Sequence, residues 1–229
     1  MNKVVANADE AIRDVFDGAA IMIGGFGLCG MPENLIRALQ RKGTKNLHTI
    51  SNNVGVDGVG NGLLLAAGQI DGALGYSFRV YVDLKARGVP IDDIVLLPMS
   101  NYGLKAYGSA ILVNTKFAAE KPEAVKGFLR AFLKGLKDTV RNPAAAIDSL
   151  LKREDDGQKE VELERLRMAI RDNILTPETR TNGLGAIDPR RLDDSIAQIA
   201  TVYAFKSKPK AEELFDANFL PPSADRRDD

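Results

Sequence analysis

A glycine-rich segment between an apolar strand and a helix constrains the fold of this chain more than any other feature. Residues 17–32 have the sequence DGAAIMIGGFGLCGMP. The compact apolar run from Ala19 to Ile23 is typical of a buried parallel strand, and Pro32 suits the first turn of a helix, where its missing N–H is not needed. Residues 47–51 predict a second strand. The order strand, loop, helix, strand is the unit of a parallel sheet.

The remaining pattern predicts an α/β fold, with a parallel or mixed sheet, flanking helices and a helix-rich C-terminal half. We expect Asn7 to cap a short first helix and Gly43 to end the helix that begins near Pro32. Further short helices are predicted at 63–67 and 78–85, and further strands at 72–75, 94–97 and 110–113.

The clearest amphipathic helix begins at Pro122 and is expected to be the best-packed element of the protein. Asn142-Pro143 should end it and begin another helix, and Asp188-Pro189 is an N-cap followed by a first-turn proline. The apolar stripe of the Pro122 helix comprises Val125, Phe128, Leu129, Phe132, Leu133, Leu136 and Val140, and that of the Pro189 helix comprises Leu192, Ile196, Ile199 and Tyr203. The polar end, 221–229, is expected to be disordered.

Composition excludes several classes of function. The 31 basic and 31 acidic residues give a net charge of zero. The sequence has no basic stripe of the kind that indicates nucleic-acid binding. No apolar run approaches the roughly 18 residues of a membrane span, so we expect no membrane insertion. With one cysteine and one histidine we expect no metal site. The N-terminus lacks the apolar core of a signal peptide, and we expect a cytoplasmic protein.

The glycine-rich segment is suited to binding an anion. Glycines let the backbone approach a ligand closely, and several N–H groups can then point at one oxygen of a phosphate, a carboxylate or a thioester. The segment fits neither the dinucleotide G-x-G-x-x-G pattern nor a P-loop, which requires a following Lys-Ser/Thr pair. The alternative is a tight turn that serves packing alone.

The same residues resemble a known signature. Asp17-Gly18, the apolar triplet 21–23, Gly24-Gly25-Phe26, Gly30 and Pro32 are similar to the signature of the 3-oxoacid (succinyl-CoA:3-ketoacid) CoA-transferases, at the start of their A-type subunit. Ser51-Asn52-Asn53, followed by Gly55-Val56-Asp57-Gly58, resembles the next segment of that family. The resemblance covers residues 1–70.

This resemblance implies CoA transfer between carboxylic acids through a covalent glutamyl thioester. The family's catalytic glutamate belongs to a separate B-type subunit, so a partner protein of that kind is implied and this chain would hold no catalytic residue. Glu33 is then a first-turn carboxylate that suits the helix dipole. The CoA thioester is a substrate, and no further cofactor is implied. The residues that would line the acyl-CoA site are Gly24, Gly25, Phe26, Gly27, Gly30, Asn52 and Asn53.

Residues 71–220 resemble a different family. The stretches 68–84, 88–99 and 107–139 are similar to periplasmic solute-binding proteins of ABC importers, of the group that binds sulfonates, taurine and pyrimidine precursors. Tyr76 and Ser77, expected at the end of a strand, would then contact a small organic solute. The alternative is that Tyr76 packs at the sheet end and Ser77 caps a helix.

Three hypotheses follow from the two resemblances. The leading one is a CoA-transferase module of the A-type subunit, 1–70, joined to a partial solute-binding module, 71–220. The second is a solute-binding component that lacks its first lobe. The third is a fusion, real or produced by sequence assembly, without a function of its own. Cys29 is expected to be a small apolar filler, because a catalytic thiol needs a base and the one histidine, His48, begins the next strand.

Overall fold

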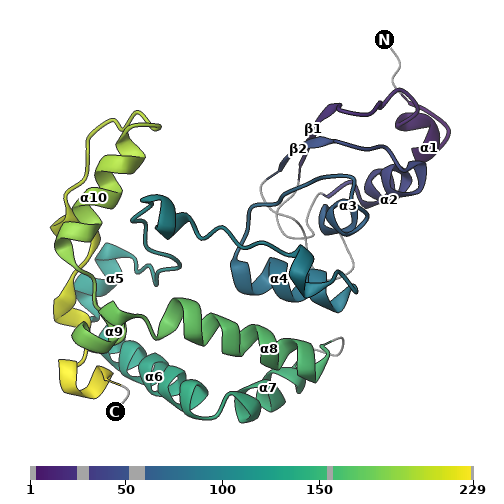
Figure 1. Ribbon diagram of the computed structural model, residues 1–229. Helices are drawn as coiled ribbons and strands as arrows, with labels where there is room; N and C mark the ends of the chain where they lie inside the picture. Colours follow the sequence, from purple (N-terminus) through teal and green to yellow (C-terminus); the bar gives the residue numbers. More distant parts are fainter. Residues whose placement is uncertain (1–3, 25–30, 52–59, 154–156, 228–229) are drawn as a thin grey trace. The chain divides into compact units, whose positions relative to one another are not determined.

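The computed structural model describes residues 4–24, 31–51, 60–153 and 157–227. The chain folds into two compact units, Met1–Leu96 and Leu97–Asp229, which differ in their secondary structure (Figure 1). The first unit holds a pair of strands with helices around them. The second is helical wherever its described residues have regular structure. The α/β fold class and the helix-rich C-terminal half are therefore confirmed.

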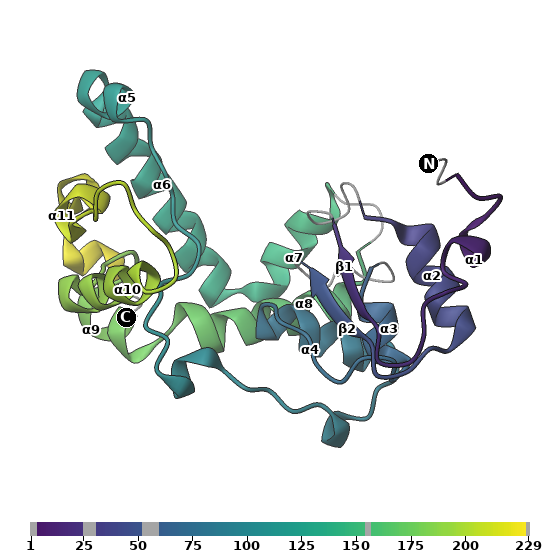
Figure 2. The same cartoon turned by 90° about the horizontal axis from the view of Figure 1, so that it is seen from above.

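The first unit is built on a parallel strand pair joined through a helix. Strand β1 (Ala20–Ile23) pairs with β2 (His48–Ser51) in a register that sets Ala20 opposite His48 and Ile23 opposite Ser51 (Figure 2). Helix α2 (Glu33–Lys42) connects them and ends at Gly43, which takes the left-handed conformation with φ of 72°. Short helices complete the unit, with bounds α1 Ala8–Ala11, α3 Gly62–Ala66 and α4 Ser77–Ala86.

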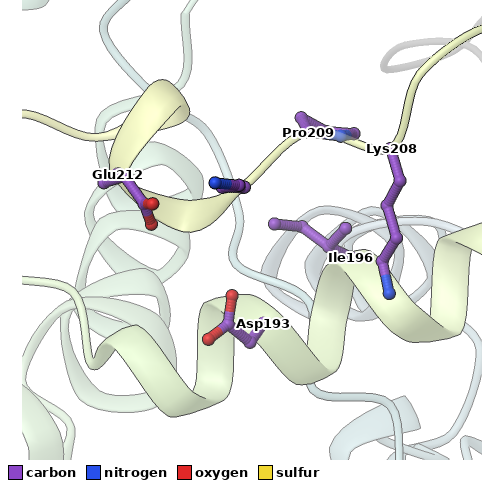
Figure 3. A pocket seen from close by; sticks show the side chains of 6 residues that line it. Asp193, Ile196, Lys208, Pro209 and Glu212 are labelled. Atoms are coloured by element: carbon purple, nitrogen blue, oxygen red, sulfur yellow. The ribbon is translucent and has the colours of Figure 1, made fainter.

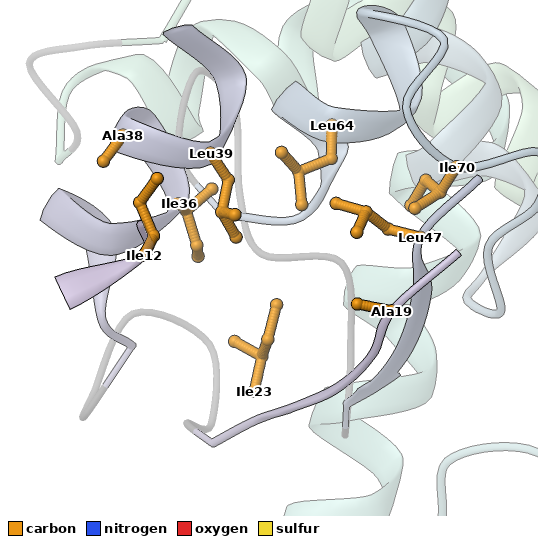
Figure 4. Close-up of a cluster of buried hydrophobic side chains, with 9 residues drawn as sticks. All are labelled: Ile12, Ala19, Ile23, Ile36, Ala38, Leu39, Leu47, Leu64 and Ile70. Atoms are coloured by element: carbon orange, nitrogen blue, oxygen red, sulfur yellow. The ribbon is translucent and has the colours of Figure 1, made fainter. Parts of the chain in front are cut away.

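The core of the first unit lies between the strand pair and helix α2 (Figure 4). Ile36 and Leu39, three residues apart, lie on the same face of α2, as helix geometry requires. Both are almost wholly buried, at 1% and 3% exposure. The side chains that share this core are Ile12, Ala19, Ile23, Ile36, Ala38, Leu39, Leu47, Leu64 and Ile70.

Two polar side chains donate hydrogen bonds to backbone carbonyls near the ends of α1 and α2. The Lys42 ammonium donates to the carbonyls of Ile12, Arg13 and Val15, which satisfies the end of the first helical segment. The buried Gln69 amide donates to the carbonyls of Leu39 and Thr44, at the end of α2. A buried amide NH₂ group that is paired in this way, as that of Gln69 is, stabilises one arrangement of the chain over its alternatives.

The second unit is a set of helices whose starts follow the sequence closely. Asn142 accepts a hydrogen bond from the Ala145 N–H at the start of α7, and Asp188 accepts from the N–H groups of Arg190 and Arg191 at the start of α10. Both N-caps precede a first-turn proline, as predicted. The helices are α5 Thr115–Glu120, α6 Pro122–Arg141, α7 Pro143–Leu151, α8 Lys159–Ala169, α9 Pro177–Asn182, α10 Pro189–Ala200 and α11 Ala211–Leu214, and α8 continues as a single π-helical turn, Ile170–Ile174.

The three further strands predicted from the sequence are wrong. Residues 72–75, 94–97 and 110–113 all lie within the part of the chain that the structure describes, and none of them forms a strand. Residues 94–97 and 110–113 are apolar and partly β-branched, which favours extended backbone, but a strand also needs a neighbour with which to pair. Among the described residues, these segments have none.

The packing of the second unit also differs from expectation. Helix α6 is not the best-packed element, because Val125 and Leu133 are its only buried residues while Phe128 and Phe132 are about half exposed. The rings of that pair stack on each other, 6.3 Å apart. On the α10 stripe Ile196 is buried, whereas Ile199 and Tyr203 are exposed.

The expected disorder of the tail is corrected in part. Residues Ser223–Arg226 form a 3₁₀ turn, and the Arg226 side chain is buried. Its guanidinium donates to the carbonyls of Pro221, Asn182 and Leu184. Two of these partners, Asn182 and Leu184, are more than 40 residues away in sequence, and composition alone does not reveal them.

Candidate functional site

The candidate site lies at the edge of the parallel pair where both strands end. Because β1 and β2 are parallel and Ile23 is opposite Ser51, the segments that follow both strands leave from the same edge. This carboxyl edge is where open parallel sheets bind ligands. Gly24 is the first residue past β1. It is exposed, and a Cβ built there would meet no atom within 4 Å.

The two segments also return to a common point. The first leads to Pro32 and helix α2, and the second leads to Gly60 and helix α3. The Glu33 carboxylate accepts a hydrogen bond of 3.0 Å from the Gly60 N–H, which joins the two return points. An ion pair of 3.1 Å from Glu33 to Arg37 holds the same carboxylate along the helix. Glu33 therefore fixes the frame of the site, in addition to its favourable position in the first turn of α2.

Asn61 is a residue of this region that sequence reasoning missed. It follows Gly60 directly and is 2% exposed, and its side-chain oxygen accepts no hydrogen bond in the part of the chain that the structure describes. A buried amide oxygen without a donor is uncommon, because losing its water costs free energy. Nothing in the sequence marks this asparagine apart from the neighbouring glycines.

Most of the predicted acyl-CoA residues lie outside the described residues. Among them Gly24 alone is described, at the carboxyl edge. Those outside are Gly25, Phe26, Gly27, Gly30, Asn52 and Asn53, together with Cys29. His48 is the first residue of β2, as expected, and it is exposed.

Tyr76 and Ser77 lie in a setting that differs from the predicted one. Residues 72–75 form no strand, so these two do not stand at a strand end. Helix α4 begins at Ser77, and its N-cap is Tyr76, with no side-chain capping bond. Tyr76 is 53% exposed and its ring stacks on that of Phe78, with centroids 5.2 Å apart. Contact of these residues with a solute stays a prediction.

A hollow in the second unit lies between α10 and the chain that leads into α11 (Figure 3). Its lining holds two carboxylates, two ammonium groups and two apolar residues. The lining residues are Asp193, Ile196, Lys208, Pro209, Lys210 and Glu212. None of these was predicted as a site residue, and the mixed charges select neither an anion nor a cation.

A polar cluster in the second unit joins residues that are far apart in sequence. The Tyr107 hydroxyl donates to Glu178 at 2.5 Å, and the Arg191 guanidinium bonds the other oxygen of that carboxylate at 2.6 Å while it stacks on the Tyr107 ring. Burial and the hydrogen bond to Glu178 raise the pKa of Tyr107 to about 12. Burial alone would raise the pKa of Glu178, but the bonds from Tyr107 and Arg191 lower it. The polar groups of this cluster are bonded to one another, so we assign the cluster a structural role.

The part of the chain that the structure describes offers no group of three histidine, cysteine or acidic residues able to hold a metal ion. None of its helices combines the length and the apolar character needed to cross a membrane.

Comparison with known proteins finds similarity in the N-terminal part of the chain. A family model described as Coenzyme A transferase matches residues 5–86. The A-type subunit of a probable succinyl-CoA:3-ketoacid coenzyme A transferase of Mycobacterium tuberculosis is 58% identical over 65 residues, which cover 28% of this chain and 26% of that protein. The A-type subunit of the Helicobacter pylori succinyl-CoA:3-ketoacid coenzyme A transferase is 50% identical over 70 residues, 31% of this chain and 30% of its own.

A human relative, succinyl-CoA:3-ketoacid coenzyme A transferase 2, mitochondrial, is 57% identical over 68 residues, which cover 30% of this chain and 13% of that protein. The first resemblance is thus confirmed for the N-terminal part. The chain spans about a quarter of the length of the mycobacterial relative that it matches. The family match also continues to residue 86, past the junction predicted at residue 70. The N-terminal part of this chain is therefore similar to the CoA-transferases.

Proposed function

We propose that the first unit is the acyl-CoA-binding part of a CoA-transferase, of the A-type subunit. The observation that carries the proposal is the frame at the carboxyl edge of β1 and β2. Two segments rich in glycine and asparagine leave from that edge, and the Glu33–Gly60 hydrogen bond joins their return points. The match of residues 5–86 to the Coenzyme A transferase family supports the same assignment.

The chemistry assigned to this frame is recognition of a thioester. Backbone N–H groups aimed at the thioester oxygen would stabilise the negative charge that develops there during acyl transfer. Glycine at position 24 would let the substrate approach the backbone, and the open space around its Cβ position suits such an approach. The Asn61 amide oxygen is a further acceptor close to Gly60.

The nucleophile would come from a partner chain. The Glu33 carboxylate is bonded to Gly60 and paired with Arg37, so it is committed to the frame. We propose that a separate protein, similar to the B-type subunit of CoA-transferases, supplies a glutamate that attacks the thioester carbonyl and releases the CoA thiolate. The thiolate would then attack the glutamyl carbonyl of the resulting anhydride, which forms the glutamyl thioester and releases the carboxylic acid. The names of the relatives suggest succinyl-CoA and a 3-ketoacid as substrates.

The proposal is tested by thermal unfolding with and without succinyl-CoA. A ligand that binds only the folded state raises its stability, and a ligand at about 100 times its Kd adds roughly 2.7 kcal/mol. We expect succinyl-CoA to raise the melting temperature, and Gly24→Val to abolish that rise, because the added side chain occupies the space proposed for the ligand. Equal melting curves of the wild-type chain with and without succinyl-CoA would refute the proposal.

Gly72→Val is the matched control. Gly72 also has open space at its Cβ position and a backbone conformation outside the left-handed region. It closely follows Gln69, whose carbonyl accepts from the Leu47 N–H just before β2 begins, at the end of the strand opposite to the carboxyl edge. We expect this variant to keep the full response to succinyl-CoA. Loss of the response in both variants would mean that Gly24→Val acts through folding rather than through the site.

Solute binding by residues 71–220 gains no support from the geometry, because the strand expected ahead of Tyr76 and Ser77 is absent. The hypothesis of a fusion without function makes a distinct prediction in the same experiment. Such a chain would respond neither to succinyl-CoA nor to an organic solute.

A further inference from the structure

Ala110–Val113 has the sequence of a strand, but its side chains are exposed to solvent. Its side chains are exposed to an unusual degree for apolar residues, with Ile111 at 47%, Leu112 at 92% and Val113 at 43%. A sequence of this type favours a pleated, half-buried surface. The segment therefore has a composition suited to a half-buried strand but an exposed position in the structure.

The backbone of the same four residues is unpaired within the part of the chain that the structure describes. None of their N–H groups donates to, and none of their carbonyls accepts from, another described residue. Such a row of open donors and acceptors is a template on which another strand can pair. Pairing would supply the neighbour that the sequence-predicted strand lacks.

Both ends of the segment are anchored, which keeps its middle available. On the N-terminal side the Lys105 carbonyl accepts from the Ser195 hydroxyl at 2.8 Å and from Arg191 at 3.0 Å, both on helix α10. On the C-terminal side the Asn114 side chain accepts from the Phe117 N–H and caps α5. A segment that is held at both ends loses less conformational entropy when a partner pairs with it.

The exposed area of the chain exceeds that of two compact domains of the same size. The chain exposes 15614 Å². Two separate compact domains of the size of its two units would expose about 12,000 Å² together. An obligate homodimer buries about 2,000–5,000 Å² in total, half of it on each partner. The excess on one chain is as large as one partner's share. Exposed apolar side chains close to the segment in sequence are Tyr102, Leu104 and Phe117.

We propose that a second copy of this chain pairs with Ala110–Val113, edge to edge and antiparallel. Residues 106–115 carry no charge, and the flanking Lys105 and Lys116 are paired with Asp194 and Glu120 within their own chain. Antiparallel pairing of two identical uncharged segments places no like charges opposite each other. It is also isologous, so it closes at two copies.

The test is the mass of the full chain in solution, measured by light scattering during size-exclusion chromatography over increasing protein concentration. We expect twice the 24.8 kDa mass of one chain. Ile111→Pro removes one N–H of the edge, and Leu112→Lys places a charge on it, so each variant should return the chain to a monomer. Leu112 is too exposed for its substitution to unfold the chain.

Leu214→Lys is the matched control, because Leu214 is 58% exposed but lies on α11. It should keep the dimer mass. Hydrogen exchange gives an independent readout: the amides of residues 110–113 should gain protection in the wild-type dimer and lose it in Leu112→Lys. A monomer at every concentration, an open-ended series of larger species, or a dimer unchanged by both edge variants would overturn the proposal.

Discussion

The Tyr107 hydroxyl contributes stability that depends on pH. Burial and the hydrogen bond to Glu178 raise its pKa from 10.0 to about 12, so folding favours the protonated phenol. Stability from a group whose pKa is raised by folding is fully present below the unfolded pKa and is lost as the pH rises through the folded one. We expect Tyr107→Phe to cost about 1 kcal/mol at neutral pH. The difference from wild type, measured by urea unfolding, should shrink between pH 10 and pH 12.

A matched control for this prediction is Tyr102→Phe. Tyr102 is 70% exposed and lies outside the cluster, so its loss should leave the wild-type profile unchanged. The contribution of Glu178 to stability depends on pH in the opposite direction. Its pKa is lowered, so its contribution is present above 4.5 and is lost as the pH falls below that value. A Tyr107→Phe difference that stayed constant up to pH 12 would contradict the role assigned to the hydroxyl.

The 3₁₀ turn Ser223–Arg226 is anchored by one side chain. Arg226 is 8% exposed, and burial lowers its pKa. Its guanidinium bonds carbonyls on both sides of Gly183, from Asn182 and Leu184, and the Arg226 carbonyl accepts from the Leu184 N–H. Removing the side chain would leave these carbonyls without a donor and would expose the apolar surface that the side chain covers. We expect Arg226→Ala to lower the free energy of unfolding by about 2–3 kcal/mol.

Urea unfolding followed by circular dichroism measures this loss, since the second unit is helical. Arg227→Ala is the control, because Arg227 is exposed and makes one bond of 3.5 Å to the Thr181 carbonyl. That substitution should change stability by less than about 0.5 kcal/mol. Equal effects of the two substitutions would show that the turn is not anchored by Arg226.

Elements that depend on local chemistry were predictable from the sequence. The caps of α7 and α10 need only an Asn or Asp before a proline, and the end of α2 needs a residue that tolerates positive φ, which is Gly43. The strand pair was also predictable, because a strand, helix and strand in sequence bring their own pairing partner. For the same reason the position of Gly24 at the carboxyl edge followed from the order of the elements.

Elements that depend on distant partners were not predictable. Ala110–Val113 has a strand sequence, but no neighbouring strand meets it in the part of the chain that the structure describes. Phe128 has the correct helical spacing for a core residue and is nonetheless 56% exposed. The Tyr107–Glu178 bond joins residues 71 positions apart. The Glu33–Gly60 bond is equally hidden, because a first-turn glutamate has a sufficient local explanation in the helix dipole.

At the scale of the whole molecule, the proposed function assigns acyl-CoA binding to one unit. The core residues of the first unit lie between Ile12 and Ile70, and the family match lies within residues 5–86. Ligand binding stabilises the cooperative region that contains the site. We therefore expect succinyl-CoA to slow hydrogen exchange of the full chain in β1, α2 and β2. Exchange in α6 and α8 should stay unchanged.

The matched variant for this measurement is again Gly24→Val, in which the slowing should disappear while the exchange rates without ligand stay close to those of the wild type. Slower exchange in α6 or α8 alone would assign the ligand to the second unit and would contradict the proposed site. The result also separates binding from self-association. Pairing through Ala110–Val113 depends on protein concentration and protects that segment. Acyl-CoA binding depends on ligand concentration and protects the strand pair. The two proposals can therefore be confirmed or refuted independently.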